Sequence, residues 1–394
     1  MVSKFIIKKN FYFTFFEKQV VPLQYKSLSY NGNVLPVSEY HNNYNLSDRT
    51  PIECVELFPT YFDATIEVPK GIKVKKIFRI NGFCIKINDH KDINSYIRAN
   101  IKSNLRTVLK RKIKGLETSF DIRYRLFYGQ ISKEDYDFLM HSLYHMLVRR
   151  FNQRDDQHDS LKRWNSYVTS VFELINEKKA SLYVIYDDQK PIQISLNYHC
   201  DKIVFLAIPS YDIDYAKFGL GNIAVQKLLE WSINNGYQML DMGYGAFDYK
   251  LKWCNHTYNL EHHFFYEQNS LMVPIMVSIF SLKTQLVNFL VSKGVNKHYH
   301  NLRSKFSKKP ESGEIEYYID RTPEDQSDDQ SDDKNQKRID FISNDSYSFL
   351  KKPVYDYLYT YLEHIEKVEV YEMQDNSSYI IKGQKNIQKI VFKR

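Results

Sequence analysis

The chain has 394 residues, with 55 Lys and Arg against 47 Asp and Glu, which gives a net charge of +8. This length is enough for two domains that each bury a core. The four cysteines are scattered, with no pair at metal-ligand spacing, so a small disulfide scaffold and a cysteine-based metal site are excluded. A reduced, cytoplasmic location is therefore expected, and the positive charge suits an anionic ligand.

Residues 1–117 form a first region that is rich in tyrosine and asparagine. Its last part predicts strands at Lys75–Arg79 and Phe83–Ile87 and then a helix from about Ile93. This helix carries a basic residue at every fourth position, at Lys102, Arg106, Lys110 and Lys114. The basic stripe is either a solvated helix face or an anion site, and Arg106 and Lys110 are our candidate substrate-binding residues.

Residues 118–270 predict a core of α+β class. Strands are expected at residues 122–128, 181–186, 192–199, 203–208, 239–243 and 262–266. One helix is expected after the capping pattern that begins at Ser132, and a second one after Gly221. The polar turns between the second, third and fourth strands are short, so these strands are predicted to form an antiparallel meander.

A pair of glycines directly precedes the second of these helices. The N–H groups in the first turn of a helix have no partner within the helix, and the helix dipole adds positive potential there. Such a turn binds phosphate or pyrophosphate, although most bare G-x-G pairs are only tight turns. The candidate cofactor-binding residues at this turn are Lys217, Phe218, Gly219, Leu220, Gly221 and Asn222.

Ionisable residues follow the next predicted strand, near its C-terminal end. Asp241 either positions or deprotonates an acceptor, or caps the following turn. Tyr249 either protonates a leaving group or packs in the core. Lys250 either binds a cofactor phosphate or is an exposed helix lysine. Asp248 is a weaker candidate, because a first-turn helix acid explains it.

The order of these elements resembles the GNAT acyltransferase superfamily, whose mixed, mostly antiparallel sheet binds acyl-CoA. More narrowly, Gly221, Asp241-Met242-Gly243 and Tyr249-Lys250 are similar to the CelD-like branch, which is associated with cellulose and exopolysaccharide biosynthesis. The resemblance covers residues 122–266. It departs from the superfamily at Ala216, where Gln or Arg is usual, and leaves Lys217 as the neighbouring cation.

The resemblance implies an acetyltransferase that moves an acetyl group from acetyl-CoA directly to an amine or hydroxyl. The implied acceptor is a sugar nucleotide or polysaccharide precursor. A main-chain N–H near Ala207–Ser210 is the implied oxyanion donor, so Ile208 joins the cofactor-binding candidates. Asp241 and Tyr249 are the candidate catalytic residues.

Kinship with Fem-type aminoacyltransferases, which pair two GNAT-like lobes, implies that residues 1–117 are a degenerate first lobe. It also leaves transfer from an aminoacyl-tRNA as an alternative. A degenerate GNAT fold that serves as a binding module is the alternative outside enzymes, and Ala216 favours it.

Three histidines, His256, His262 and His263, suggest a metal site at first sight. The adjacent pair, however, points to opposite faces of a strand, and no Cys or carboxylate spacing completes a ligand set. We therefore expect no metal. No serine or cysteine lies in a nucleophile-elbow pattern either, so transfer in a ternary complex is favoured over an acyl-enzyme.

Residues 271–322 predict a helix and then a basic segment. The apolar run within Leu271–Val291 is too short to span a bilayer, so we expect a helix packed in the core, with an interfacial amphipathic helix as the alternative. Residues 323–337 are acidic and predict a solvated linker. Residues 338–394 predict a small α+β appendage, with a helix at 348–365 and strands at 368–373, 379–382 and 387–392.

Overall fold

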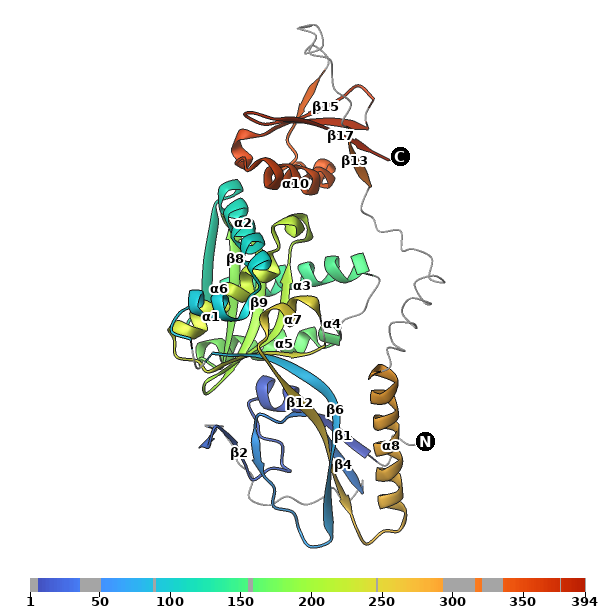
Figure 1. Ribbon diagram of the computed structural model, residues 1–394. Helices are drawn as coiled ribbons and strands as arrows, with labels where there is room; N and C mark the ends of the chain where they lie inside the picture. The colour runs from blue at the N-terminus through green and yellow to red at the C-terminus, as the bar shows by residue number, and fades with distance from the viewer. Residues whose placement is uncertain are drawn as a thin grey trace.

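The computed structural model describes residues 6–35, 51–87, 90–154, 159–245, 247–292, 316–320, 336–375 and 377–393. Within these ranges the chain forms one large sheet of nine strands, a C-terminal sheet of five strands and a small sheet of three strands. The large sheet runs through the lower and middle parts of the molecule, and the C-terminal sheet lies above it (Figure 1).

The large sheet is mixed and mostly antiparallel. Its strands lie in the order β1 (Ile6–Asn10), β4 (Ile52–Pro59), β12 (His256–Glu267), β6 (Ile72–Lys86), β11 (Met239–Tyr244), β10 (Ile203–Tyr211), β9 (Lys190–Cys200), β8 (Ala180–Asp187) and β7 (Ile122–Phe127). Only the pairs β1–β4 and β10–β11 are parallel. This sheet with its flanking helices confirms the predicted α+β class and the meander from β7 to β10.

The N-terminal region adds strands to this same sheet. The two strands predicted at 75–79 and 83–87 are one continuous strand, β6, which pairs with β11 on one side and β12 on the other. The small sheet, formed by β2 (Ser27–Tyr30), β3 (Asn33–Val34) and β5 (Asp63–Thr65), also belongs to this region. In the short π-helix Phe13–Glu17, the rings of Phe15 and Phe16 pack against Phe62, which directly precedes β5.

Helices cover both faces of the sheet. On one face, α3 (Lys133–Arg154) and α5 (Trp164–Asn176) bury leucine and valine side chains against β8 and β9. On the other face, α1 (Ile93–Asn100), α2 (Ser103–Ser119) and α6 (Leu220–Asn234) pack on β10 and β11. The helix predicted from Ile93 is broken at Ile101, whose backbone is extended. The short helices α4 (Asp159–Lys162) and α7 (Asp248–Trp253) complete this part.

The face of β9 beneath α6 carries a row of buried polar side chains, namely Gln193, Ser195, Asn197 and His199. Each is at most 3% exposed. At one end of this row the His199 ring lies 2.8 Å from Ser181 Oγ through Nε2 and 3.0 Å from the Tyr237 hydroxyl through Nδ1. Burial lowers the pKa of His199 to about 3, since the imidazolium would lose its hydration.

We expect this histidine to make the fold sensitive to acid. Its pKa is near 6.5 in the unfolded chain, so between pH 6.5 and about 3 the folded state binds fewer protons than the unfolded state. The stabilisation is complete above pH 6.5 and is lost as the pH falls, with a slope of up to about 1.4 kcal/mol per pH unit. Urea unfolding at several pH values should show a shallower slope for His199→Gln than for wild type. Equal slopes would mean that His199 titrates alike in both states.

α8 (Met272–Ser292) differs from our prediction of a core helix. Val273 and Val277 are buried against the sheet, but only 17% of the window Met272–Leu290 is buried. Within the described ranges, α8 is long enough and apolar enough to span a membrane, judged by length and composition alone. The apolar pattern predicted the helix correctly, but it overestimated how much of its surface is covered.

The C-terminal sheet has the order β13 (Tyr317–Asp320), β17 (Ile387–Phe392), β16 (Ser378–Lys382), β15 (Glu369–Glu372) and β14 (Lys337–Ile339), with α10 (Lys351–Tyr361) against it. The last three predicted strands and the helix are confirmed. β13 precedes the acidic segment and β14 follows it. We had predicted that this segment links two domains, but it connects two strands of one sheet. The segment itself, residues 321–335, lies outside the described residues.

Candidate active site

An opening in the large sheet creates the candidate site. β10 and β11 pair only at Ile203–Phe205 and Met239–Asp241. A register shift between Leu206 and Ile208, where β10 pairs with β9, marks a bulge just beyond this point. A cavity of about 260 Å³ lies here between the second half of β10 and α6. The bulge and the short pairing thus open the sheet where a ligand can enter.

The cavity has a polar end and an apolar end. Its lining consists of Arg150, Gln193, Ser195, Leu206, Pro209, Ser210, Tyr211, Gly219, Gly221, Asn222, Ala224, Val225, Leu228 and Tyr249. The glycine turn begins α6, while Leu228 lies two turns further along the same helix and close to Leu206. A ligand with a charged end and an uncharged arm fits this distribution.

The glycine turn leaves backbone donors available. Gly219 is the N-cap of α6 and has φ +70°, which is the left-handed region that favours glycine. The N–H groups of Asn222 and Ile223 both turn back to the Gly219 carbonyl. Among the described contacts, the N–H groups of Leu220 and Gly221 have no acceptor. Together with the helix dipole, these two donors form a site for an anion.

A lysine from α2 lies directly over this turn. A Cβ atom added to Gly219 would meet Lys112 Nζ at 2.8 Å and Lys112 Cδ at 2.9 Å. Burial, and then the nearby charges of Arg111 and Lys252, lower the pKa of Lys112. No carboxylate among the described residues pairs with it, so an anion at the turn would supply its missing counter-charge. Lys112 therefore places a cation over the glycine turn.

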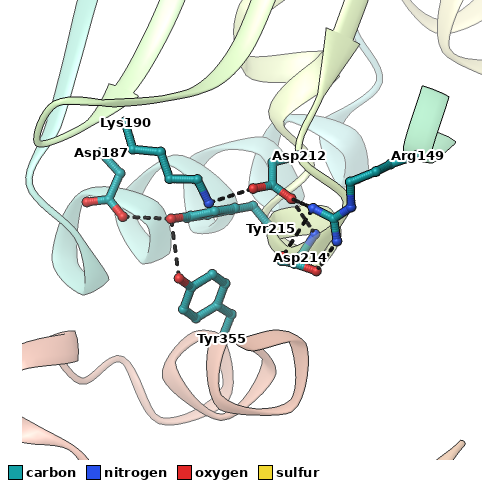
Figure 2. Close-up of polar contacts among 7 residues, drawn as sticks. All are labelled: Arg149, Asp187, Lys190, Asp212, Asp214, Tyr215 and Tyr355. Carbon is teal, nitrogen blue, oxygen red and sulfur yellow. Dashed lines mark hydrogen bonds and ion pairs between the residues drawn. The ribbon is translucent and has the colours of Figure 1, made fainter. Parts of the chain in front are cut away.

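A network of charged and phenolic side chains fixes the segment that leads into the turn (Figure 2). Arg149 of α3 pairs with Asp212 at 2.8 Å and with Asp214 at 3.0 Å, and Lys190 reaches Asp212 at 2.7 Å. Although burial opposes it, Lys190 and Arg149 hold the pKa of Asp212 below its ordinary value. The 3-10 helix Ile213–Phe218 therefore starts from an anchored carboxylate.

The same network reaches the C-terminal unit. Tyr215 donates to Asp187 Oδ2 at 2.7 Å and its hydroxyl lies 3.5 Å from that of Tyr355 on α10 (Figure 2). The C-terminal unit, which consists of the five-stranded sheet and α10, thus packs through α10 against the 3-10 helix that leads into the glycine turn.

Two buried polar atoms of the cavity have no hydrogen-bond partner among the described residues, Gln193 Oε1 and Ser210 Oγ. Gln193 uses its amide nitrogen to donate to Ser195 Oγ at 2.6 Å. Leaving such atoms unsatisfied costs about 1–3 kcal/mol each, so a ligand that donates to them is favoured. Acyl-CoA carries a pyrophosphate and amide N–H groups along a flexible arm, and these residues fit it.

Asp241 does not line the cavity but lies fully buried in a cluster of tyrosines. Its Oδ1 accepts from the Tyr258 hydroxyl at 2.6 Å and from the Gly243 N–H at 2.8 Å. Its Oδ2 accepts from the hydroxyls of Tyr61 at 2.8 Å and Tyr12 at 3.3 Å. Burial raises the pKa of Asp241, while these donors act against that rise. The carboxylate thereby joins β11 to the N-terminal region and to β12.

A glycine makes room for this cluster. Gly82 of β6 lies beside Tyr258 in the register, and a Cβ atom there would come within 2.2 Å of the Tyr258 ring. The ring passes over the bare backbone of Gly82 to bring its hydroxyl to Asp241. Any side chain at position 82 would displace it.

The predicted residues fall into two groups. Gly219, Gly221, Asn222 and Tyr249 line the cavity. Ile208, Phe218 and Leu220 do not line it, because their side chains are buried in the cores. Lys217 lies 3.9 Å from Asp356 of the C-terminal unit.

Lys250 also points away from the cavity. Its ammonium donates to the Tyr244 carbonyl at 2.7 Å, and burial lowers its pKa to about 8 against the raising effect of Asp241. Arg106 and Lys110 lie on α2 but do not line the cavity.

Sequence reasoning missed the residues that come from distant segments. Lys112 lies between two members of the basic stripe, Lys110 and Lys114, and the sequence alone does not tie its helix face to Gly219. Arg150, which lies 4.7 Å from the Tyr211 ring centroid, comes from the end of α3. Tyr12 and Tyr61 precede Asp241 by about half the chain, and no local pattern distinguishes them from the other tyrosines.

The histidines behave as the strand geometry predicted. His263 faces the N-terminal core, where its Nδ1 lies 2.8 Å from the Tyr25 hydroxyl, while His262 faces the other side. One grouping was not predicted: ligand atoms of Cys54, Glu56 and His262 lie within 4.8 Å of one another. Lys8 pairs with Glu56 at 2.7 Å, and burial raises the pKa of Cys54, so both features oppose a cation there.

Comparison with known families shows what this region is similar to. Residues 103–251 match the family model described as an acetyltransferase (GNAT) domain, from α2 to α7. This region is thus similar to GNAT acetyltransferase domains. The matched region includes the glycine turn, Lys112 and most of the cavity wall, and it begins with α2 rather than after it.

The chain has distant structural neighbours, and no curated protein matches it. A conserved protein of unknown function from Bacteroides thetaiotaomicron is 8% identical with a TM-score of 0.36, covering 55% of this chain and 69% of that one. FemX is 12% identical with a TM-score of 0.36, covering 56% and 73%. A tandem GNAT protein from the clavulanic acid biosynthesis pathway is 7% identical with a TM-score of 0.30, covering 56% and 66%.

Proposed function

We propose that the protein transfers an acyl group, in the simplest case acetyl, from acyl-CoA to an amine or hydroxyl. The observation that carries this proposal is the cavity between β10 and α6. It combines two free backbone donors at Leu220 and Gly221 with the uncompensated ammonium of Lys112. A pyrophosphate would satisfy all three, and the polar atoms of Gln193 and Ser210 would receive the arm.

In this reaction the acceptor attacks the thioester carbonyl directly. A carbon–nitrogen or carbon–oxygen bond forms, the carbon–sulfur bond breaks, and the acceptor gives up its proton to solvent. Main-chain N–H groups beside the bulge of β10 polarise the carbonyl; Pro209 has none, which leaves Ile208 and Ser210. Tyr249, which lines the cavity, protonates the leaving thiolate.

Asp241 acts as a positioning residue in this proposal. Its contacts with Tyr12, Tyr61 and Tyr258 hold β11 in place where it diverges from β10. The resemblance of the Asp241-Met242-Gly243 and Tyr249-Lys250 motifs to the CelD-like branch supports a sugar nucleotide or polysaccharide precursor as acceptor. Arg106 and Lys110, on the helix that carries Lys112, would contact an anionic acceptor, in a cytoplasmic setting.

Calorimetric or thermal-shift titration with acetyl-CoA tests this function. A ligand at a hundredfold excess over its dissociation constant adds about 2.7 kcal/mol of stability, which raises Tm by several degrees. Lys112→Gln should weaken binding about tenfold or more, because it removes a partly buried cation from the pyrophosphate. Lys114→Gln, on the exposed side of the same helix, is the matched control.

The parallel titrations separate the alternatives. Acetyl-CoA binding that Lys112→Gln weakens and Lys114→Gln leaves alone supports the proposal. A salt-sensitive response to aminoacyl-tRNA, with none to acetyl-CoA, would instead support Fem-like aminoacyl transfer. A lack of response to both ligands would favour a binding module without catalysis.

A further inference from the structure

α8 presents an ordered apolar stripe to solvent. Its members, spaced alternately by three and four residues, are Met272, Ile275, Ile279, Leu282, Leu286 and Phe289. Each of these side chains is between 55 and 67% exposed. Leu271, at 89%, extends the stripe at its start. Exposed apolar surface of this extent on one helix marks an interaction site.

The opposite side of α8 is held on the sheet. Val273 and Val277 are buried with Phe264 of β12 and Ile77 of β6. Near its end, Asn288 donates to the Phe78 carbonyl at 2.9 Å and accepts from Arg79 at 3.0 Å. α8 therefore lies flat against the sheet as part of the folded protein, along the lower part of the molecule (Figure 1). Its stripe faces away from the sheet.

Basic side chains flank this helix on both sides. A cavity of about 310 Å³ on one side is lined by Lys8, Arg79 and Lys283 together with Phe280 and Val287 of α8. The hollow on its other side is lined by Lys75 together with Gln285 and Asn288 of α8. The one acid in these two linings is Glu56, and Lys8 neutralises it. β6 and α8 themselves contain no acid among their described residues.

This arrangement of charge discriminates between two partners. If a second copy docked stripe to stripe, the lysines beside each α8 would approach one another without acids to pair with. An anionic lipid surface instead accepts the apolar stripe at the level of the acyl chains and the flanking cations at the level of the headgroups.

We propose that α8 docks this protein on membranes that contain anionic lipid. The helix axis lies parallel to the membrane surface, with the six stripe residues immersed. Lys75, Arg79 and Lys283 contact the lipid phosphates. The protein stays folded on binding, because the buried face of α8 remains on the sheet. This inference is independent of the proposed acyl transfer.

Vesicle sedimentation with the full-length protein tests the proposal. We expect binding to phosphatidylcholine vesicles with about one third phosphatidylglycerol, and much weaker binding to pure phosphatidylcholine. The combined variant Ile279→Ser, Leu282→Ser and Leu286→Ser should lower the partition coefficient at least about tenfold. Phe138→Ser, a residue of α3 that is 49% exposed, should leave it unchanged.

Charge reversal tests the second half of the surface. Lys75→Glu with Lys283→Glu should lower binding to anionic vesicles at least about tenfold and should have little effect on neutral ones. Thermal unfolding shows whether each variant is folded, and all replaced side chains are at least partly exposed. Equal binding to both vesicle types, or none, would overturn the proposal. A concentration-dependent dimer in light scattering that the triple serine variant abolishes would also overturn the proposal, because the stripe would then be a dimer interface.

Discussion

Gly221→Asp is expected to weaken acyl-CoA binding about 100-fold while the protein keeps its stability. A Cβ atom at this position has only Tyr211 Cε1 nearby, at 3.9 Å, so the new side chain fits. An acid in the first turn of a helix is favourable, by about 0.3–1 kcal/mol. The carboxylate, however, would lie where the pyrophosphate is expected, and the repulsion of two like charges at this range costs about 3 kcal/mol, which corresponds to a loss of affinity of about 100-fold. Calorimetry with acetyl-CoA and thermal unfolding measure the two effects separately.

Gly221→Asn is the matched control, because it has the same shape without the charge. It should reduce affinity far less than Gly221→Asp. Gly219→Ala tests another property of the turn, since a side chain there meets Lys112 and must adopt φ +70°. That variant should lose stability as well as affinity. Unchanged affinity in Gly221→Asp would show that the anion site lies elsewhere.

Asp241→Ala is expected to lower the free energy of unfolding by about 3–5 kcal/mol. The change leaves three buried tyrosine hydroxyls and the Gly243 N–H without their acceptor, and each unsatisfied group has its own desolvation cost. Urea unfolding at neutral pH measures the loss. Tyr61→Phe, which removes a single donor from this cluster, should cost only about 1 kcal/mol.

Asp241→Asn separates structure from chemistry. The amide keeps the size of the side chain and one acceptor oxygen, so the loss of stability should be well below that of Asp241→Ala. If the residue only positions β11, turnover should follow stability across these variants. A stable Asp241→Asn protein that binds acetyl-CoA normally but has lost its turnover would show that the carboxylate itself takes part in the reaction.

The parts of the fold that local pattern determines were predictable. The strands from β7 to β11 and the glycine turn of α6 depend on neighbouring residues, and the sequence indicates them directly. The cavity was predictable only in part. Gly219, Gly221 and Tyr249 follow from motifs, whereas Lys112 reaches the turn because α2 packs against α6, and that packing is a tertiary event.

The same limit explains the other differences. Asp241 was found from its place at the end of a strand, but Tyr12 and Tyr61 reach it only after the N-terminal region has joined the sheet. For α8, periodicity shows that a helix forms but not which of its faces a neighbour covers. The exposed row from Met272 to Phe289 and the buried pair Val273 and Val277 are equally apolar, so only packing distinguishes them.

The position of β6 shows that the residues matched by the family model are not a complete folding unit. Residues 103–251 match the GNAT model, yet β6, at residues 72–86, is the strand that covers the outer side of β11. A fragment limited to the matched residues would leave β11 with an open edge and would remove the Tyr12, Tyr61 and Tyr258 hydroxyls from Asp241. Such a fragment is expected to aggregate when expressed. The smallest piece that folds by itself therefore has to begin near the N-terminus and continue through β12.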